Sequence, residues 1–150
     1  AVSVADDVGF PRIADAVNTL CGSEYKRFQE SWFVPSVMRQ WYGDRYRVWF
    51  PKLAIGGKAV ANGWNNRLSD DGTYIYEYNE DADLVDPVGD PNDIRITFAK
   101  SADPVTRIQA YRFVGVFRRI SNSEDGTRKR YQRIETVFPI HRTPCLPIHR

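Results

Sequence analysis

The sequence has only two cysteines, Cys21 and Cys145, and two histidines, His141 and His149, among its 150 residues. Two cysteines are far too few for a disulfide scaffold and fit a reducing compartment, so we expect a cytoplasmic protein. Both histidines fall in the proline-rich segment 141–150, which makes a Ser-His-Asp or Cys-His catalytic centre improbable. His141, Cys145 and His149 are spaced four residues apart, but a zinc site usually needs four ligands at closer, paired spacing. We therefore expect neither a metal nor a cofactor.

The sequence also lacks a long apolar run, since no stretch approaches the roughly 18 apolar residues of a membrane-spanning helix. The first twenty residues carry Asp6, Asp7 and Asp15 where a secretion signal would have a basic start and an apolar block. We therefore expect neither secretion nor membrane insertion. What the sequence does contain, 42% hydrophobic and 27% charged residues, is typical of one globular domain. A domain of this length can bury roughly 70% of its unfolded surface and needs no disulfide to hold a core.

Charge is divided unevenly along the chain. Residues 1–100 hold 11 Lys and Arg against 15 Asp and Glu, whereas residues 101–150 hold 10 against 4. Nine of the acidic residues lie between Asp70 and Asp93, a block that usually marks a solvated loop. The basic end interleaves arginine with aromatic residues, which suits a phosphate-bearing partner because guanidinium groups bind phosphate oxygens and flat rings stack on bases. The candidate phosphate contacts are Arg112, Arg118, Arg128, Lys129, Arg130 and Arg133.

Hydrophobic spacing predicts helices within the first 43 residues. One helix is expected over residues 11–22, because Pro11 suits a first helical turn and Gly22 can supply the left-handed stop. A second is expected to begin at Ser23 and to stop before Pro35, and a further helical turn to end at Gly43. The apolar residues behind these predictions are Ile13, Val17 and Leu20, then Tyr25, Phe28 and Trp32, then Val37, Met38 and Trp41.

From residue 44 onward the hydrophobic pattern alternates, which predicts strands over 45–50, 73–78, 94–98, 110–120 and 127–138. The last two are joined through Asp125-Gly126, a step typical of hairpin turns. Gly115 in the middle of a strong strand predicts a bulge or a sharp bend. The pattern indicates an α+β domain, a small curved sheet or β-barrel with N-terminal helices packed against it. Its expected parts are a helical segment 1–43, a β-rich core 44–140 and a proline-rich tail 141–150.

The aromatic content, with four Trp and eight Tyr, exceeds what a core requires. Residues 62–67, Asn-Gly-Trp-Asn-Asn-Arg, predict a loop that places a ring beside two carboxamides and a guanidinium, the groups that a base pocket needs. A tight turn rich in Asn would contain the same residues for backbone reasons alone. Tyr74, Tyr76 and Tyr78 could equally form the half-buried face of a strand. The candidate pocket residues are Trp49, Trp64, Asn65, Asn66, Tyr74 and Tyr76.

The last predicted hairpin resembles one found in a known superfamily. Phe98-Ala99-Lys100 and the run Ala110-Tyr111-Arg112-Phe113-Val114-Gly115-Val116-Phe117-Arg118-Arg119, followed by a charged turn and a basic return strand, resemble the tyrosine-glycine hairpin of PUA-like domains. Within that superfamily the chain is most similar to the modified-base readers, the SRA and EVE domains. The resemblance implies a small curved barrel whose concave face takes up a modified base, often flipped out of duplex DNA and held between aromatic rings. It also implies, in bacteria, the recognition half of a modification-dependent restriction system with a nuclease domain or subunit as partner.

We therefore expect a DNA-binding domain, without catalytic activity in this chain, that reads a modified base. Two alternatives stay open. In a protein-interaction module, the acidic stretch 70–93 would meet a basic partner and tryptophans would anchor the interface. In a metal-dependent nuclease, Asp15 and Glu24-Tyr25-Lys26 would hold Mg²⁺, but they fall on predicted helices rather than on adjacent strands. Gly56-Gly57-Lys58 lacks the flanking residues of a phosphate-binding loop and predicts a plain turn.

Overall fold

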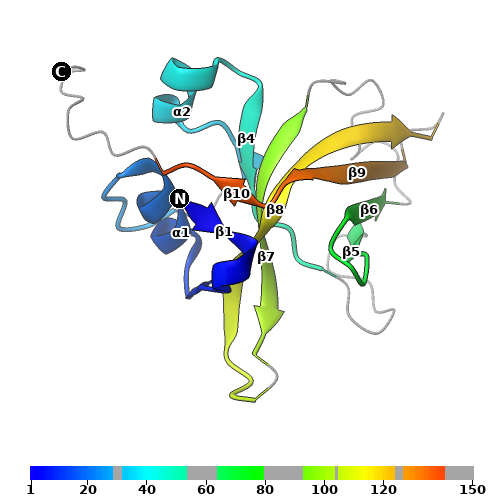
Figure 1. Cartoon of the computed structure of the whole chain (residues 1–150), viewed down its shortest axis with the longest axis horizontal. Helices are drawn as coiled ribbons and strands as arrows, with labels where there is room; N and C mark the ends of the chain where they lie inside the picture. The colour runs from blue at the N-terminus through cyan, green and yellow to red at the C-terminus, as the bar shows by residue number, and fades with distance from the viewer. Residues whose placement is uncertain (29–31, 54–63, 80–92, 104, 124–126, 141–150) are drawn as a thin grey trace.

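The computed structural model describes residues 1–28, 32–53, 64–79, 93–103, 105–123 and 127–140. The Asp125-Gly126 turn, Gly56-Gly57-Lys58 and the tail 141–150 lie outside these residues, as does most of the acidic stretch. No helix of the described part is long and apolar enough to cross a membrane. In chain order the elements in Figure 1 are β1 (Val2–Ser3), the 3-10 helix η1 (Val4–Asp6), β2 (Gly9–Phe10), α1 (Ile13–Cys21), β3 (Trp32–Phe33), α2 (Ser36–Tyr42), β4 (Tyr46–Trp49), β5 (Trp64–Leu68), β6 (Tyr74–Asn79), β7 (Ile94–Ala102), β8 (Gln109–Asn122), β9 (Arg128–Glu135) and β10 (Val137–Phe138).

Eight strands form one mixed sheet, in the order β3-β4-β7-β8-β9-β6-β5, with β2 paired to β8 beside this path. Only β4 and β7 run parallel among the described neighbours, and β1 and β10 form a separate two-stranded sheet. The predicted hairpin is confirmed, because β8 and β9 pair antiparallel near the middle of the sheet. The α+β fold is confirmed as well. Residues 1–43 supply three short strands in addition to the two helices, and two of those strands join the main sheet.

The main sheet is strongly curved. Because β7 and β8 lie between β4 and β9, a flat sheet would separate those two strands by about 14 Å. The ring centroids of Trp49 on β4 and Tyr131 on β9 nevertheless lie only 5.1 Å apart. A single bridge also links Leu53, just after β4, to Asn66 on β5 at the opposite edge. The side of the sheet that carries Trp49 and Tyr131 is therefore the inside of the curve, called the inner face below; the other side is the outer face.

Gly115 lies at a bulge in β8, as the sequence predicts. The register of β8 shifts next to this residue both against β7 and against β9. Its φ angle of 132° belongs to the range that side chains rarely adopt and glycine adopts freely. A β-carbon here would overlap the Cδ atom of Arg133 and lie 3.0 Å from the carbonyl oxygen of Glu135. The bulge lets the central strand bend, which contributes to the curvature.

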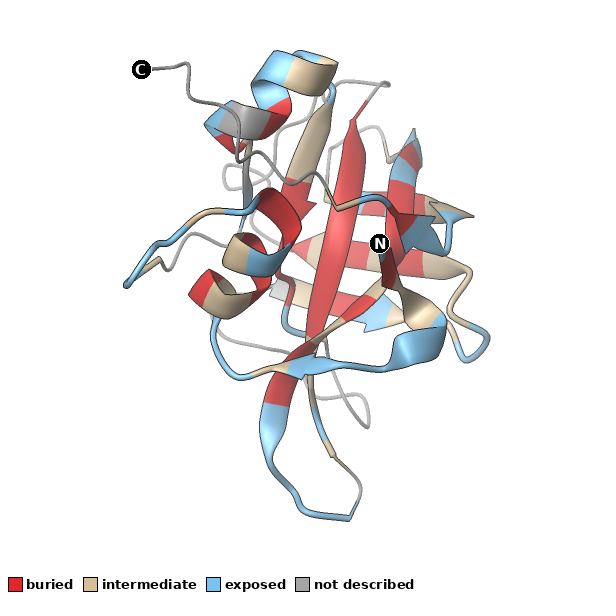
Figure 2. Cartoon of the chain, turned by 60° about the vertical axis from the view of Figure 1, so that its left-hand side comes forward, coloured by how far each residue is buried: buried red, intermediate tan, exposed pale blue. Residues whose placement is uncertain are grey.

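The main hydrophobic core lies between the two helices and the outer face of β4, β7 and β8. Figure 2 shows that α1 turns its buried side toward the sheet. The predicted alternation of β7 is confirmed, since Ile94, Ile96 and Phe98 join this core and Arg95 and Thr97 point to the inner face. In Figure 1, β5, β6 and β9 lie on the side of the molecule away from the helices, so no described helix covers their outer face. Fully buried core residues include Val17, Leu20, Met38, Val48, Ile96 and Phe98.

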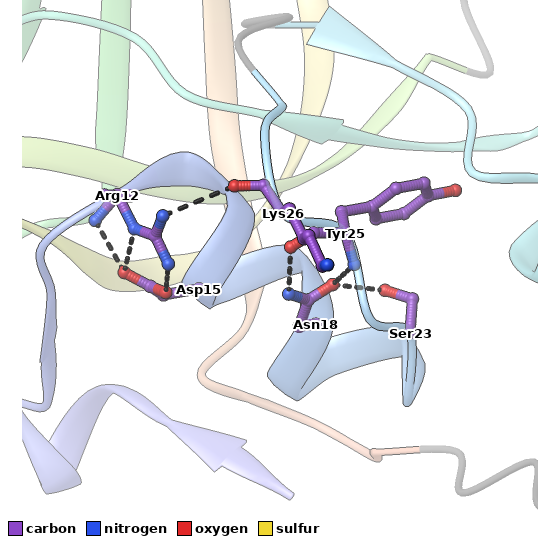
Figure 3. A network of polar contacts seen from close by, with 6 residues as sticks. All are labelled: Arg12, Asp15, Asn18, Ser23, Tyr25 and Lys26. Carbon is purple, nitrogen blue, oxygen red and sulfur yellow. Dashed lines mark hydrogen bonds and ion pairs between the residues drawn. The ribbon is translucent and has the colours of Figure 1, made fainter.

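The predicted helices ending at Gly22 and Gly43 are confirmed as α1 and α2, but the helix expected after Ser23 is wrong. The Asn18 side chain of α1 accepts hydrogen bonds from the Tyr25 backbone N–H and from the Ser23 hydroxyl, both at 2.8 Å, and donates to the Tyr25 carbonyl at 2.8 Å (Figure 3). The Tyr25 carbonyl would otherwise accept a hydrogen bond within a helix, so these contacts hold the segment after Gly22 against α1 in a non-helical conformation. Trp32, expected on that helix, belongs to strand β3.

The predicted loop 62–67 is also wrong over its described part, because residues 64–68 form strand β5. Asn65 pairs with Tyr78 and Asn66 with Glu77 in an antiparallel register. The turn preference of asparagine yields here to pairing with β6, whose tyrosines and isoleucine favour an extended strand. These residues therefore project alternately to the two faces of the sheet.

Candidate functional site

The inner face carries an unusually polar set of buried side chains. In the described part of the chain, eight polar or charged residues are buried, and all come from strands β5 to β9 or the residue before β7. Their pairing and alternation place them on the inner face. Interiors are normally apolar and bury a charge only with a partner, so this face differs from an ordinary core. The eight residues are Asn66, Glu77, Asn79, Asp93, Arg95, Thr97, Arg119 and Lys129.

Arg95 lies at the centre of this polar set. Its guanidinium carbon is 4.5 Å from the ring centroid of Trp49 and 4.6 Å from that of Tyr131. The same group donates hydrogen bonds of 2.9 to 3.2 Å to the Asp93 carboxylate. Burial alone lowers the pKa of Arg95, but Tyr131, Asp93 and Glu77 raise it more, so the net shift is upward. The guanidinium is therefore charged, packed beside both rings and fixed in orientation.

Tyr131 connects this centre to β6. Its hydroxyl donates a 2.9 Å hydrogen bond to Oε1 of Glu77. Burial raises the pKa of Tyr131 well above its ordinary value, and the carboxylates of Glu77 and Asp93 act in the same direction while Arg95 opposes them. The phenol consequently stays neutral and keeps its role as a donor. Glu77, Tyr131, Arg95 and Asp93 thus form a connected network across the inner face.

Two side chains of the inner face have buried polar atoms without a hydrogen-bond partner, Oδ1 of Asn66 and Nε and Nη1 of Arg47. Nη1 of Arg47 lies 3.7 Å from the Asp93 carboxylate, which is too long for a hydrogen bond. Buried polar atoms in folded proteins are nearly always paired, so exceptions call for an explanation. The inner face therefore offers one acceptor and two donors that a bound molecule could use.

Trp32, which the sequence pattern predicted on a helix, also belongs to this site. It pairs with Trp49 at the edge of the sheet and is 46% exposed. The guanidinium carbons of Arg47 and Arg95 lie 5.0 and 5.6 Å from its ring centroid. A ring that stacks on cations and still keeps exposed surface can also stack on a base. The sequence signal for Arg95 was a charge inside a strongly apolar alternating run, but the sequence did not reveal its partners.

The predicted pocket residues separate onto the two faces of the sheet. Trp49 and Asn66 belong to the inner face, whereas Asn65, Tyr74 and Tyr76 point to the outer face. Trp64 begins β5, and its side chain lies outside the described part of the structure. A single pocket cannot hold both sets, since neighbouring residues of a strand project in opposite directions. The assignment of each residue to a base stays a prediction.

The predicted phosphate contacts are likewise divided. Arg118, Arg128 and Arg130 are exposed, and they alternate with inner-face residues on β8 and β9, so they belong to the outer face. Their exposure and charge are compatible with phosphate binding. That role stays a prediction.

The remaining three basic residues have partners within the chain. Lys129 is a buried inner-face residue, and Arg133 packs against the bulge at Gly115. Arg112 lies toward the far end of β8, where its guanidinium is 3.3 Å from Asp7 and 3.8 Å from Asp103. The structure therefore does not gather the six basic residues into one surface.

Metal and catalytic chemistry receive little support from the described residues. No group of three or more His, Cys, Asp or Glu in that part of the chain is placed to hold a metal. Asp15, considered above for a nuclease, accepts hydrogen bonds from the Arg12 backbone N–H at 3.1 Å and from the Arg12 guanidinium at 2.8 Å (Figure 3). These contacts stabilise the start of α1. A cavity of about 250 Å³ lies beside the C-terminal part of β7, lined by Lys52, Leu53, Lys100, Ser101, Ala102 and Gln109.

A family model and a solved structure show what this chain is similar to. No curated protein matches it. Among solved structures, it is similar to one described as the 5-hydroxymethylcytosine-specific restriction enzyme AbaSI, with a TM-score of 0.67 and 23% identity over 90% of this chain. The match covers 41% of the AbaSI chain. The family model of the SET and RING associated domain, SRA, matches residues 1–140. The chain therefore belongs to the SRA family, whose domains bind DNA carrying modified cytosine by base flipping, as the resemblance of the last hairpin led us to expect.

Proposed function

We propose that the inner face of this SRA domain takes up a flipped cytosine whose 5-substituent is polar, such as a hydroxymethyl group. The observation that carries the proposal is a pair of unpartnered buried groups on the inner face: Arg47 Nε and Nη1, beside the ring of Trp32, and Asn66 Oδ1 on β5. Enzymes and readers that extract a base hold it by stacking and by hydrogen bonds to its edge. The inner face supplies both kinds of group.

The chemistry of cytosine fits these atoms. The exocyclic amino group of cytosine is a hydrogen-bond donor, and an amide oxygen such as Asn66 Oδ1 can accept that hydrogen bond. Its other edge atoms are acceptors, which suit the guanidinium of Arg47. Trp32, exposed and backed by Arg47 and Arg95, provides a surface on which the ring can stack. The network of Glu77, Tyr131, Arg95 and Asp93 would hold these groups in place.

A polar substituent is favoured over a methyl group because Oδ1 of Asn66 has two lone pairs, so the oxygen that accepts from the amino group can also accept from a hydroxyl on the neighbouring 5-substituent. A site built to bind a hydroxyl discriminates strongly against an analogue without it, since its buried polar groups then stay unpaired. Leaving one such buried group unpaired costs about 1–3 kcal/mol, or roughly 5- to 150-fold in affinity. The name of AbaSI states a specificity for 5-hydroxymethylcytosine, which supports the same choice for this chain.

The alternative of a protein-interaction module has less support. Its acidic stretch lies mostly outside the described residues, and Asp93 at the end of that stretch is buried against Arg95. Because AbaSI is described as a restriction enzyme and this chain matches only 41% of it, we propose that the cleaving activity belongs to another domain or subunit. A cytoplasmic location stays a prediction.

The test compares the affinities of the domain for duplexes that carry cytosine, 5-methylcytosine, 5-hydroxymethylcytosine or glucosylated 5-hydroxymethylcytosine at one position. The decisive variant is Asn66→Leu, which keeps the branched shape of the side chain and removes the unpartnered oxygen. Its matched control is Asn65→Leu, the neighbouring position on the outer face. We expect Asn66→Leu to reduce the preference for 5-hydroxymethylcytosine by about tenfold or more, at the value of one hydrogen bond, and the control to leave it unchanged.

Thermal stability separates a binding role from a structural one. Because Oδ1 of Asn66 has no partner in the fold, replacing Asn66 by leucine should leave the melting temperature unchanged or raise it. Equal selectivity in wild type and Asn66→Leu would defeat the assignment of this residue. Equal affinity of the wild type for all four duplexes would defeat the proposed function itself.

A further inference from the structure

The outer face of β5, β6 and β9 carries a regular arrangement of tyrosines and arginines that the proposed function does not use. Tyr74, Tyr76 and Tyr78 alternate along β6, and each has an arginine over its ring. Arg67 lies 5.3 Å from the centroid of Tyr76, Arg130 lies 5.6 Å from Tyr74, and Arg128 lies 5.0 Å from Tyr78. These six residues are called the tyrosine–arginine face.

Among the six residues of the tyrosine–arginine face, only the three arginines are charged. Arg67, Arg128 and Arg130 are exposed and form no ion pair with any residue that the structure describes. The acidic residue of β6, Glu77, points to the inner face and is bonded to Tyr131. A concentration of arginine without carboxylates attracts polyanions, and the strongest polyanion available to a DNA-binding domain is the DNA backbone.

The stacking of these arginines suits them to phosphate. A guanidinium that stacks on a ring through its flat face keeps its N–H groups, which lie in the plane, free for an anion. Contact with the ring also limits the freedom of the side chain, so less entropy is lost when phosphate binds. Arg67 and Arg130 pair with Tyr76 from opposite sides, which spaces their strands by about 10 Å across the face. The face thus presents several aligned contacts rather than one.

A duplex held at the inner face cannot also cover the tyrosine–arginine face. The two surfaces are opposite sides of the same strands, since Tyr76 and Glu77 are neighbours on β6 that point in opposite directions. DNA has a persistence length of about 150 base pairs, so a short duplex does not bend around the sheet. We propose that the tyrosine–arginine face binds the phosphate backbone of a second duplex, independently of its sequence and modification, while the inner face holds the modified base.

The experiment asks whether the domain brings two short duplexes together. A donor-labelled duplex carries 5-hydroxymethylcytosine, an acceptor-labelled duplex is unmodified, and energy transfer between them is measured as the acceptor duplex and the salt are titrated. For wild type we expect transfer that decreases with salt. The variant Arg67→Gln, Arg128→Gln, Arg130→Gln should lose most of it, and the slope of log affinity against log salt for the acceptor duplex should fall by nearly three, at about 0.9 per phosphate contact.

A matched variant removes the same charge elsewhere. Arg27→Gln, Arg45→Gln, Arg107→Gln changes three exposed arginines that form no ion pair with a described residue and lie away from the tyrosine–arginine face, and it should bridge the duplexes like wild type. Sedimentation should show one chain with two duplexes. Three results would overturn the proposal. Energy transfer could persist in the first variant, it could fall equally in both variants, or sedimentation could show two chains with two duplexes.

The selectivity for the modified duplex, measured in the same samples, reports on the inner face. Phosphate contacts carry no direct information about the base, so this selectivity should be equal in wild type and in both variants. Loss of selectivity in the Arg67→Gln, Arg128→Gln, Arg130→Gln variant would assign these arginines to the base-reading duplex and overturn the second site. Absence of selectivity in wild type, with bridging retained, would contradict the proposed function alone.

Discussion

Replacing Gly115 by alanine tests the account of how the sheet bends. At a φ of 132° an L-residue is strained by about 1–3 kcal/mol. The new β-carbon would also overlap the side chain of Arg133 and press on the Glu135 carbonyl, and overpacking of this kind costs about 1–3 kcal/mol. We therefore expect Gly115→Ala to lower the free energy of unfolding by about 3 kcal/mol, which in a domain of this size lowers the melting temperature by roughly 6–12 °C.

The assay is urea unfolding of four proteins: wild type, Gly115→Ala, Arg133→Ala and the double variant. Shortening Arg133 removes the Cγ and Cδ atoms that the new β-carbon would meet, but leaves the backbone strain in place. The alanine at position 115 should therefore cost about 1–2 kcal/mol less in the Arg133→Ala background, a coupling that a double-mutant cycle can resolve.

Gly43 provides the control. Its φ is also positive, at 69°, but a β-carbon there would meet no atom within 4 Å. Gly43→Ala should accordingly cost about 1–3 kcal/mol from backbone strain alone, since its φ of 69° and ψ of −149° lie in a region that essentially only glycine adopts. If Gly115→Ala cost no more than Gly43→Ala and showed no coupling to Arg133, the contact between the bulge and Arg133 would have no part in the fold.

Three further predictions follow from single contacts. Asn18→Ala should expose the segment after Gly22, because it removes three hydrogen bonds to Ser23 and Tyr25. Hydrogen exchange at the Tyr25 amide should therefore become faster. An unchanged exchange rate would show that Asn18 does not hold the segment. Burial raises the pKa of Cys21 to about 12. In a Cys145→Ser variant, this thiol should therefore resist iodoacetamide at pH 8 until the protein unfolds. Rapid labelling of the folded protein would contradict the burial of Cys21. The raised pKa of Tyr131 means that the unfolded state releases this proton above about pH 10 while the folded state keeps it. The stabilisation from this group is therefore fully present below pH 10 and decreases as the pH rises. Tyr131→Phe should weaken this decrease. It should also cost about 1–3 kcal/mol of stability at neutral pH, because it leaves Glu77 without its hydrogen-bond partner.

Features that depend on neighbours along the chain could be predicted from the amino-acid order alone. Apolar residues at helical spacing identified α1 and α2, and strict alternation identified the strands from β4 to β9 apart from β5. The position of Gly115 in an otherwise strong strand located the bulge. The same hairpin also carried the resemblance to modified-base readers, and the SRA family model confirms it over residues 1–140.

Where distant residues compete with local preference, the sequence was misleading. Tyr25 has helical spacing to other apolar residues, but its backbone N–H and carbonyl form hydrogen bonds with the Asn18 side chain. The described residues around Tyr25 therefore form no helix. Asn65 and Asn66 are typical turn residues, but pairing with β6 extends them. Propensities amount to fractions of a kcal/mol per residue, so a few hydrogen bonds to another element are enough to reverse them.

Which side chains meet depends on the three-dimensional fold. Trp49 and Tyr131 are 82 positions apart, and no local pattern says that the sheet curls until their rings lie 5.1 Å from one another with Arg95 beside both. The same geometry places Asn66 inside and Tyr76 outside, so that candidates grouped by composition separate into two surfaces. Strand order and curvature result from the packing of the whole sheet, which is why residues of the right chemistry were visible in the sequence while their grouping was not.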